Sequence, residues 1–322
     1  MKTRSIGPLT LSSVILGSAY FGSQLPREVS FDLLDTYYAL GGRTLDTARV
    51  YGAWSPAGVG ASEAVIGAWI ASRQPADITL ITKGAHPPAG AMHTPRLSRE
   101  DILGDAEASA EALGRAPDLW LLHRDDVSRP VEEIAESLAS LVERGLAKCV
   151  GASNWRTARI AEYNDYASSR GLPCFVCSQI QWSLAVTTPS AYGDDTLVCM
   201  DDREYAWYRE RQFPVLAYSS QAKGFFSKAI AGGPGALSEK AKTRFASPQN
   251  LEKLELVRAE AARTGRTPAS VVLQYITENA VPACAIVGCS SVAQLRDSLP
   301  CPACAGATRD SGVLSNNDSG SR

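Results

Sequence analysis

The feature that most constrains the fold of this chain is a regular alternation of short apolar runs with amphipathic, helix-like segments. Strands that are apolar on both faces and separated by helices are typical of a parallel sheet covered by helices. Eight such units favour an α/β fold with a single closed (β/α)8 TIM barrel over a doubly wound open sheet. The eight runs end near Gly17, Asp46, Lys83, His123, Ser153, Gln179, Tyr218 and Gly288.

The open-sheet alternative also lacks its phosphate-binding motif. After the first run, residues Gly17 to Gly22 offer only two glycines, at the wrong spacing for G-x-G-x-x-G. The residues before that run predict a short N-terminal β-hairpin. We therefore expect one barrel domain over residues 1–300, followed by a disordered tail over residues 301–322, where the composition turns to Ala, Gly, Ser, Asn and Asp.

Several helix starts can be identified between the apolar runs. Ser98 is a plausible cap, Pro130 opens a second helix, and Ser247-Pro248 and Thr267-Pro268 begin two more. Two stretches have no clear pattern, residues 53–60 and the longer, glycine-rich residues 219–247. Both follow strand ends, so we expect them to form a lid over the barrel mouth.

Composition and charge exclude several classes of partner. The 322 residues carry 32 basic and 34 acidic side chains, a net charge of -2, with no basic block. Nucleic acid and membrane surfaces are therefore not expected as partners, and we expect a cytoplasmic protein. The Cys301–Cys304 spacing could bind zinc or cycle as a dithiol, but no companion pair lies nearby, so we predict no metal site.

Four side chains that could carry chemistry follow different strand ends. Asp46, Lys83 and His123 close three of the apolar runs, and Tyr51 follows Asp46 by five residues. The C-terminal ends of barrel strands meet at one rim, so these groups should converge. Tyr51 could then protonate a substrate carbonyl, with Lys83 lowering the pKa of the phenol, Asp46 holding Lys83, and His123 orienting the carbonyl.

Each of these residues also has an ordinary structural explanation. Tyr51 could be an amphipathic surface residue, Asp46 a turn former, Lys83 a solvated lysine and His123 a satisfied rim histidine. Their joint occurrence at the strand ends of one barrel favours the catalytic interpretation.

Motifs along most of the chain, from about Ile6 to about Leu299, resemble those of the aldo-keto reductase family. The matching pieces are Leu45-Asp46-Thr47-Ala48 with Tyr51-Gly52, Gly60-Ala61-Ser62-Glu63, Ile66-Gly67, Thr82-Lys83, Leu122-His123, Gly151-Ala152-Ser153-Asn154-Trp155, Gln179 and Tyr218-Ser219. The resemblance implies a catalytic tetrad of Asp46, Tyr51, Lys83 and His123, with Tyr51 as the general acid. It also implies a nicotinamide dinucleotide bound in extended form across the barrel mouth.

The resemblance further implies which residues contact that cofactor. The carboxamide would be bound by Ser153, Asn154 and Gln179, with Tyr218 stacked on the nicotinamide ring. The loop after one strand, with Ser219, Gln221 and Lys223, would contact the pyrophosphate. The segment after the last strand, with Gly288, Ser290, Gln294 and Asp297, would hold the adenosine phosphate. Members that prefer NADPH commonly carry Arg or Lys in that last region, where Cys289, Ser290 and Gln294 are uncharged. We expect NADPH, with NADH as the alternative.

The expected function is the NAD(P)H-dependent reduction of an aldehyde or ketone to an alcohol, or the reverse. Aromatic residues near the rim, Tyr20, Trp54, Trp155 and Trp182, are candidates for contacting a small-molecule carbonyl or alcohol substrate, although Trp155 and Trp182 could equally pack in the core. The alternative function is a regulatory subunit that senses the cofactor with little turnover, which the atypical tail keeps open. The sequence predicts no particular oligomeric state.

Overall fold

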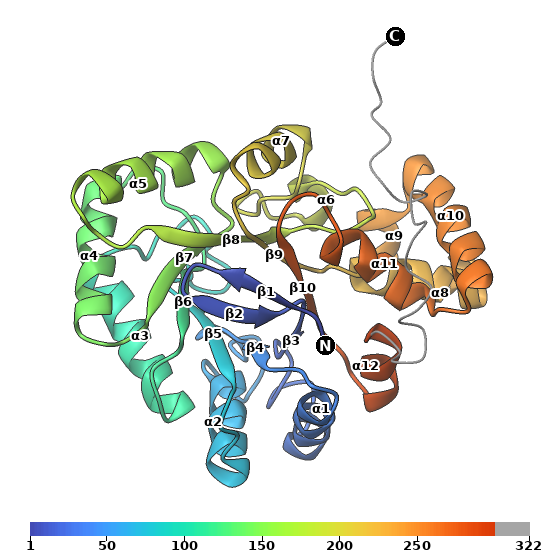
Figure 1. Ribbon diagram of the computed structural model, residues 1–322, viewed down its shortest axis with the longest axis horizontal. Helices are drawn as coiled ribbons and strands as arrows, with labels where there is room; N and C mark the ends of the chain where they lie inside the picture. Colours follow the sequence, from blue (N-terminus) through green and yellow to red (C-terminus); the bar gives the residue numbers. More distant parts are fainter. Residues whose placement is uncertain (300–322) are drawn as a thin grey trace.

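The computed structural model describes residues 1–299, which form a closed eight-stranded barrel in the order β10-β3-β4-β5-β6-β7-β8-β9 (Figure 1). All neighbouring barrel strands pair in parallel, as predicted. The strands are β3 (Val14–Gly17), β4 (Thr44–Asp46), β5 (Thr79–Gly84), β6 (Leu119–Leu122), β7 (Cys149–Ser153), β8 (Phe175–Gln181), β9 (Val215–Tyr218) and β10 (Ala283–Val287). The TIM-barrel prediction is confirmed.

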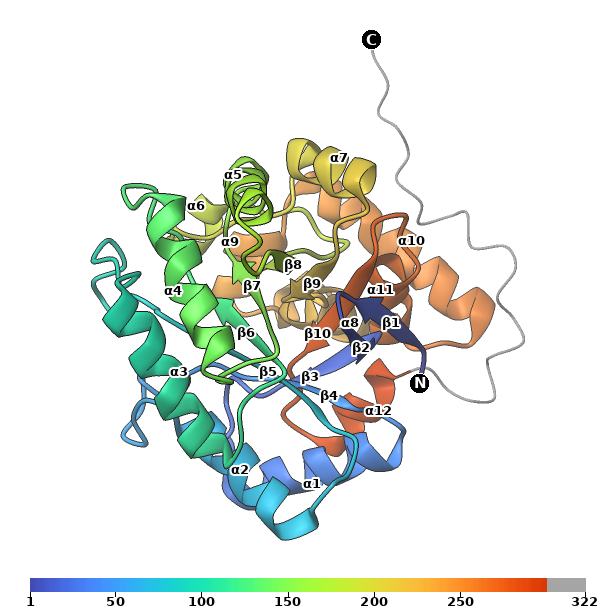
Figure 2. The ribbon, with the colours of Figure 1, turned by 60° about the vertical axis from the view of Figure 1, so that its left-hand side comes forward.

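Helices surround the barrel, and consecutive ones pack against each other around the ring, as α1 packs on α2 and α2 on α3 (Figure 2). The helices are α1 (Arg27–Ala39), α2 (Ala61–Arg73), α3 (Arg99–Leu113), α4 (Val131–Glu143), α5 (Thr157–Ser169), α6 (Pro189–Tyr192), α7 (Asp202–Arg211), α8 (Phe225–Gly232), α9 (Glu239–Phe245), α10 (Pro248–Thr264), α11 (Pro268–Thr277) and α12 (Val292–Ser298). Ser98, Ser247 and Thr267 accept hydrogen bonds from the first turns of α3, α10 and α11, so these predicted caps are confirmed.

The predicted N-terminal hairpin closes the barrel at the end opposite the predicted site. It consists of β1 (Thr3–Ile6) and β2 (Leu9–Ser12), paired antiparallel. Ile6 and Leu11 are fully buried and pack with inward-facing side chains of the barrel, including Leu121. The hairpin therefore covers apolar surface that the N-terminal mouth of the barrel would otherwise expose.

The prediction of an irregular stretch over residues 219–247 was wrong. This segment contains α8, α9 and two short 3-10 turns, Ala222–Gly224 and Pro234–Ala236. Phe225, Phe226 and Phe245 are almost completely buried in one apolar cluster. Burial of these rings stabilises helices that the glycine-rich run between them obscures in the sequence.

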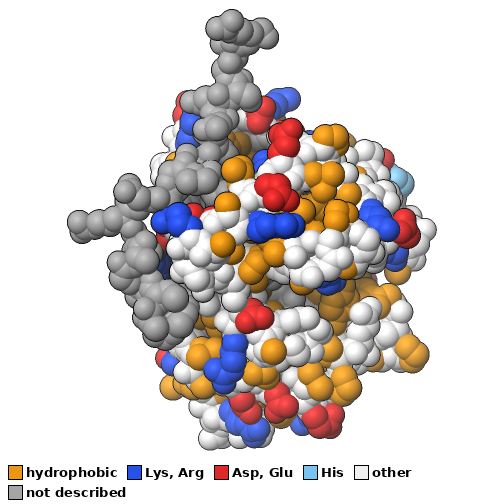
Figure 3. All heavy atoms as spheres, turned by 90° about the vertical axis from the view of Figure 1, so that its right-hand side faces the viewer, with side chains coloured by type: hydrophobic (Ala, Val, Ile, Leu, Met, Phe, Trp, Pro, Cys, Tyr) orange, Lys and Arg blue, Asp and Glu red, His pale blue; other side chains and the backbone are white. Residues whose placement is uncertain are grey.

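The surface and the chain end add three observations. Acidic and basic side chains are interspersed on the face that carries α8 and α10 (Figure 3). Within residues 1–299, no helix is long and apolar enough to cross a membrane, and no cluster of His, Cys, Asp and Glu is arranged to hold a metal. The tail of residues 301–322, with its Cys301–Cys304 pair, lies outside the described residues, and the predicted division into barrel domain and tail stays a prediction.

Candidate active site

The predicted catalytic residues meet at the C-terminal mouth of the barrel. Asp46 is the last residue of β4, Lys83 lies in β5, His123 directly follows β6, and Tyr51 lies in the loop after β4. A cavity of about 520 Å³ opens there, and Asp46, Tyr51 and His123 line it. Lys83 lies behind them and is 1% exposed.

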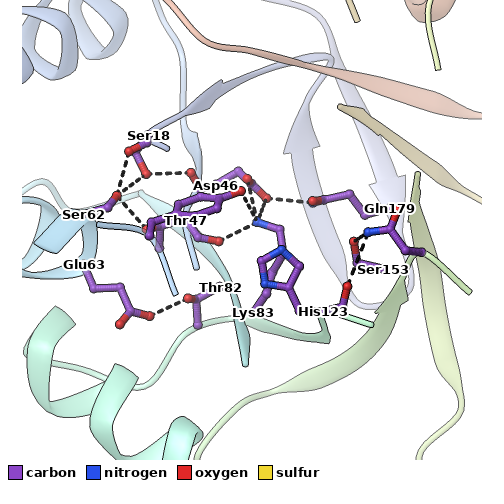
Figure 4. Close-up of polar contacts among 12 residues, drawn as sticks. Ser18, Asp46, Thr47, Ser62, Glu63, Thr82, Lys83, His123, Ser153 and Gln179 are labelled. Carbon is purple, nitrogen blue, oxygen red and sulfur yellow. Dashed lines mark hydrogen bonds and ion pairs between the residues drawn. The ribbon is translucent and has the colours of Figure 1, made fainter. Parts of the chain in front are cut away.

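The Lys83 ammonium connects Asp46 to Tyr51. Lys83 Nζ donates to Asp46 Oδ2 at 2.8 Å, to Asp46 Oδ1 at 3.0 Å and to the carbonyl oxygen of Thr47 at 2.6 Å (Figure 4). It also lies 3.3 Å from the hydroxyl oxygen of Tyr51. A buried ammonium is stable only when it is paired and hydrogen-bonded, and this one is.

The electrostatics of this group differ from the prediction in one respect. Burial acts to lower the pKa of Lys83, but Asp46 and Tyr51 together outweigh burial, and the pKa of Lys83 is raised. Lys83 acts to lower the pKa of Tyr51, as predicted, but burial raises it more, so the net pKa of the phenol is raised rather than lowered. The phenol therefore keeps its proton at neutral pH.

His123 is buried in an environment that keeps it neutral. Burial, the neighbouring His86 and Arg124 hold the pKa of His123 well below its usual range. The His86 and His123 rings lie edge to face with their centroids 4.6 Å apart. Nδ1 of His123 has no hydrogen-bond partner among the described residues. An unpartnered lone pair costs less than an unpartnered N–H, so we infer that the proton lies on Nε2.

A hydroxyl network that the sequence analysis missed fixes the backbone after β4. Ser18 Oγ donates to the carbonyl oxygen of Asp46 at 2.8 Å, and the hydroxyls of Ser62 and Thr47 lie 2.8 Å apart. Buried Glu63 accepts from Thr82 Oγ1 at 2.6 Å, one residue before Lys83. Ser62 and Glu63 belong to a motif quoted for the family resemblance, which was the available signal.

All eleven residues predicted to contact the cofactor line the same cavity as Tyr51 and His123. Gln179 Nε2 donates to Asp46 Oδ1 at 2.7 Å, so this side chain is held against the Lys83 pair. The Tyr218 hydroxyl donates to Asn154 Oδ1 at 2.8 Å, which fixes the orientation of the ring. Asn154 has a positive φ of 59°, a left-handed conformation that asparagine tolerates better than most residues.

The phosphate end of the predicted site carries a second lysine. Ser219 and Lys223 have positive φ values of 51° and 55° in the tight loop after β9. Lys228 of α8 also lines the cavity and was not singled out from the sequence. At the opposite wall, Gln221 Nε2 donates to Ser298 Oγ at 2.9 Å, which ties this loop to α12.

Of the two interpretations of Trp155 and Trp182, substrate contact and core packing, the structure favours core packing. Trp155 is fully buried, with its ring edge to face against Phe175 at a centroid distance of 5.2 Å. Trp182 is 2% exposed and packs edge to face against Tyr275 and Tyr205. Both rings therefore fill the core outside the cavity.

The other two predicted aromatic residues lie at the rim. Tyr20 lines the cavity, with its ring 6.0 Å from Lys223 Nζ. Trp54 is 47% exposed, and its ring centroid lies 5.9 Å from that of Tyr51. These two positions are compatible with substrate contact, which stays a prediction.

A model of the aldo/keto reductase family matches residues 13–301 of this sequence. The chain belongs to the aldo/keto reductase family. Among curated relatives of this reductase, norsolorinic acid reductase stcV of Emericella nidulans is 28% identical over 92% of this chain and 76% of its own length. The uncharacterized oxidoreductase YrpG of Bacillus subtilis is 27% identical over 90% of this chain and 87% of its own. Norsolorinic acid reductase of Aspergillus flavus is 30% identical, but the match covers only 56% of this chain and 47% of the relative's own length.

Proposed function

We propose that this aldo/keto reductase is an NAD(P)H-dependent enzyme that reduces an aldehyde or ketone to an alcohol, or catalyses the reverse reaction. The observation that carries the proposal is the contact of Lys83 Nζ with the Tyr51 hydroxyl, 3.3 Å apart, beside the Asp46 carboxylate. A protonated phenol next to a buried cation can give up its proton in the transition state, because the cation stabilises the phenolate that forms.

In this mechanism Tyr51 is the general acid. Its raised pKa keeps the phenol protonated before the reaction. Lys83 stabilises the phenolate after proton transfer, and Asp46 holds the ammonium in place through two hydrogen bonds. Because Lys83 and Asp46 are almost completely buried and Tyr51 is partly buried, water screens the interaction of Lys83 with Tyr51 less than it would at the surface.

His123 orients the carbonyl. As a neutral imidazole protonated on Nε2, it can donate a hydrogen bond to a carbonyl oxygen without competing with Tyr51 as a proton source. The edge-to-face packing of the Tyr51 and His123 rings, 6.0 Å between centroids, brings two donors to one side of the cavity.

The polar groups lining the cavity fit a nicotinamide dinucleotide, which would supply the hydride when bound. Ser153 Oγ accepts from Asn154 Nδ2 at 3.1 Å, so its own hydroxyl hydrogen can be donated to a carboxamide oxygen. Gln179 uses its amide nitrogen on Asp46, which leaves its oxygen free to accept from a carboxamide NH2. The fixed ring of Tyr218 offers a flat apolar surface for stacking.

The coenzyme we propose is NADPH, with NADH as the alternative. Lys223 and Lys228 line the cavity near Ser219 and Gln221, and two ammonium groups suit a ligand with several phosphates. Asp297 on the facing α12 also lines the cavity and would disfavour a 2'-phosphate close to it. The proposal includes a small-molecule carbonyl or alcohol substrate contacted by Tyr20 and Trp54, and a cytoplasmic location.

Binding and turnover together test this function. NADPH and NADH are titrated into the protein while intrinsic tryptophan fluorescence is followed, and aldehydes are then added while the absorbance of the reduced nicotinamide is recorded. We expect binding of at least one cofactor and consumption with some aldehydes. Tight cofactor binding with no turnover on any carbonyl would instead favour the sensing subunit.

A further inference from the structure

The cavity contains a cation that the proposed chemistry does not use. Arg124 directly follows His123 at the end of β6 and lines the same cavity as Tyr51. Its side chain is 10% exposed, so the charge is largely removed from bulk water. A buried guanidinium is costly unless it is matched, and its partners therefore indicate what it is for.

The protein satisfies this guanidinium only in part. Nε donates to Thr196 Oγ1 at 3.0 Å and Nη1 to the carbonyl oxygen of His123 at 2.9 Å. Nη2 reaches Asp194 Oδ2 only at 3.4 Å, and Asp194 also accepts two hydrogen bonds from Thr196 through its other oxygen. A guanidinium has five N–H donors, so two have no partner among the described residues.

Among residues 1–299, Asp194 is the one carboxylate within ion-pair distance of Arg124, at 3.4 Å, and the other titratable groups around this part of the cavity add no further net charge. Lys83 is neutralised by Asp46. Tyr51 and His123 are uncharged at neutral pH because the pKa of the phenol is raised and that of the imidazole is lowered. Leu197, from the same loop as Thr196, adds an apolar wall.

We propose that Arg124 is a specificity-determining residue that binds a carboxylate on the substrate, so that the preferred substrates are aldehydes or ketones carrying a carboxylate. This inference rests on the proposed function. The planar guanidinium presents paired N–H donors that match the two oxygens of a carboxylate, and in a partly desolvated cavity that contact is strong. The contact between Arg124 and the His123 carbonyl oxygen places this anchor beside the residue that orients the reacting carbonyl.

A purely structural role is the competing explanation. Arg124 connects the barrel to residues 194–197, so it could merely hold that loop against the rim. The matched control is Asp194→Asn, which weakens the loop contact but keeps the guanidinium. Arg124→Met removes the charge and keeps a long apolar side chain.

The test compares the 3- and 4-carboxybenzaldehydes with the corresponding formylbenzamides, which have nearly the same shape but no charge. In the wild type, we expect kcat/KM at least tenfold higher for the carboxylate in one of the two pairs. In Arg124→Met this ratio should fall tenfold or more, mainly through KM, whereas Asp194→Asn should keep it. Equal ratios in wild type and Arg124→Met would overturn the assignment.

A measurement on the wild type alone avoids dependence on the folding of a variant. Benzoate should inhibit competitively with aldehyde at a concentration at least tenfold lower than benzamide, and equal inhibition would contradict the inference. Failure of the proposed function gives a different result. In that case none of the four aldehydes is reduced, although cofactor binds. If instead the uncharged aldehydes are reduced with a kcat/KM equal to or higher than that of the carboxylates, only the role of Arg124 is rejected.

Discussion

The hydroxyl oxygen of Tyr51 lies 3.3 Å from Lys83 Nζ, and the same nitrogen lies 2.8 Å from Asp46 Oδ2. Burial raises the pKa of the phenol, while the ammonium favours the phenolate. The site thus holds a weak acid whose conjugate base is stabilised where it forms. This arrangement suits proton donation to a carbonyl oxygen better than a freely ionised tyrosine would.

The Asp46–Lys83 pair should show strong coupling in stability. We expect Asp46→Asn and Lys83→Met each to lower the free energy of unfolding by about 3–5 kcal/mol, because each leaves one charge buried without its partner. The double variant should lose much less than the sum, since no unpaired charge remains. Urea denaturation of the four proteins measures this, and additive losses would show that the two charges do not depend on each other.

Stability should fall in mild acid through the partly buried His86. Burial and Arg124 lower the pKa of His86 to about 4, whereas an unfolded histidine titrates near 6.5. The unfolded state therefore binds more protons between these values, and stability present above pH 6.5 is lost as pH falls toward 4. His86→Gln should reduce this loss by about 1–3 kcal/mol, measured by denaturation between pH 4.5 and 7.5. His93→Gln, at a surface position, should keep the wild-type slope, and an unchanged slope in His86→Gln would contradict the prediction.

Substitution of the core residue Trp155 and of the rim residue Trp54 should affect different properties of the protein. Trp155→Leu should cost about 3 kcal/mol of unfolding free energy because it leaves a cavity in a packed core, with little change in KM. Trp54→Leu should change stability by less than about 0.5 kcal/mol but raise KM for aromatic aldehydes several-fold. Denaturation and steady-state kinetics on both variants check this. A raised KM in Trp155→Leu without a loss of stability would indicate that Trp155 contacts substrate after all.

The lysines at the phosphate end should discriminate between the coenzymes. The 2'-phosphate of NADPH adds about two negative charges that NADH lacks. The double variant with Lys223→Met and Lys228→Met should therefore weaken NADPH binding about tenfold more than NADH binding. Fluorescence titration of the wild type and the double variant with each coenzyme measures the ratio. Equal losses for the two coenzymes would limit these lysines to the phosphates that both cofactors share.

The strand ends could be predicted because parallel barrel strands are apolar on both faces and stop at polar residues, as at Asp46 and His123. Which side chains contact one another at the mouth of the barrel could not be predicted. An aromatic side chain after a strand can pack inward or face the mouth, and the sequence does not distinguish Trp155 from Trp54. Arg124 was missed because an arginine followed by Asp125 and Asp126 is typical of a solvated turn.

The rate of hydride transfer in Tyr51→Phe tests most directly the claim that Tyr51 donates the proton to the substrate carbonyl. The hydroxyl is lost while the ring keeps its place near Trp54 and His123. We expect single-turnover reduction of an aldehyde by bound NADPH to slow by about 10²–10⁴-fold, with cofactor affinity nearly unchanged. A turnover rate within a few-fold of the wild type would contradict the assignment of Tyr51 as the proton donor.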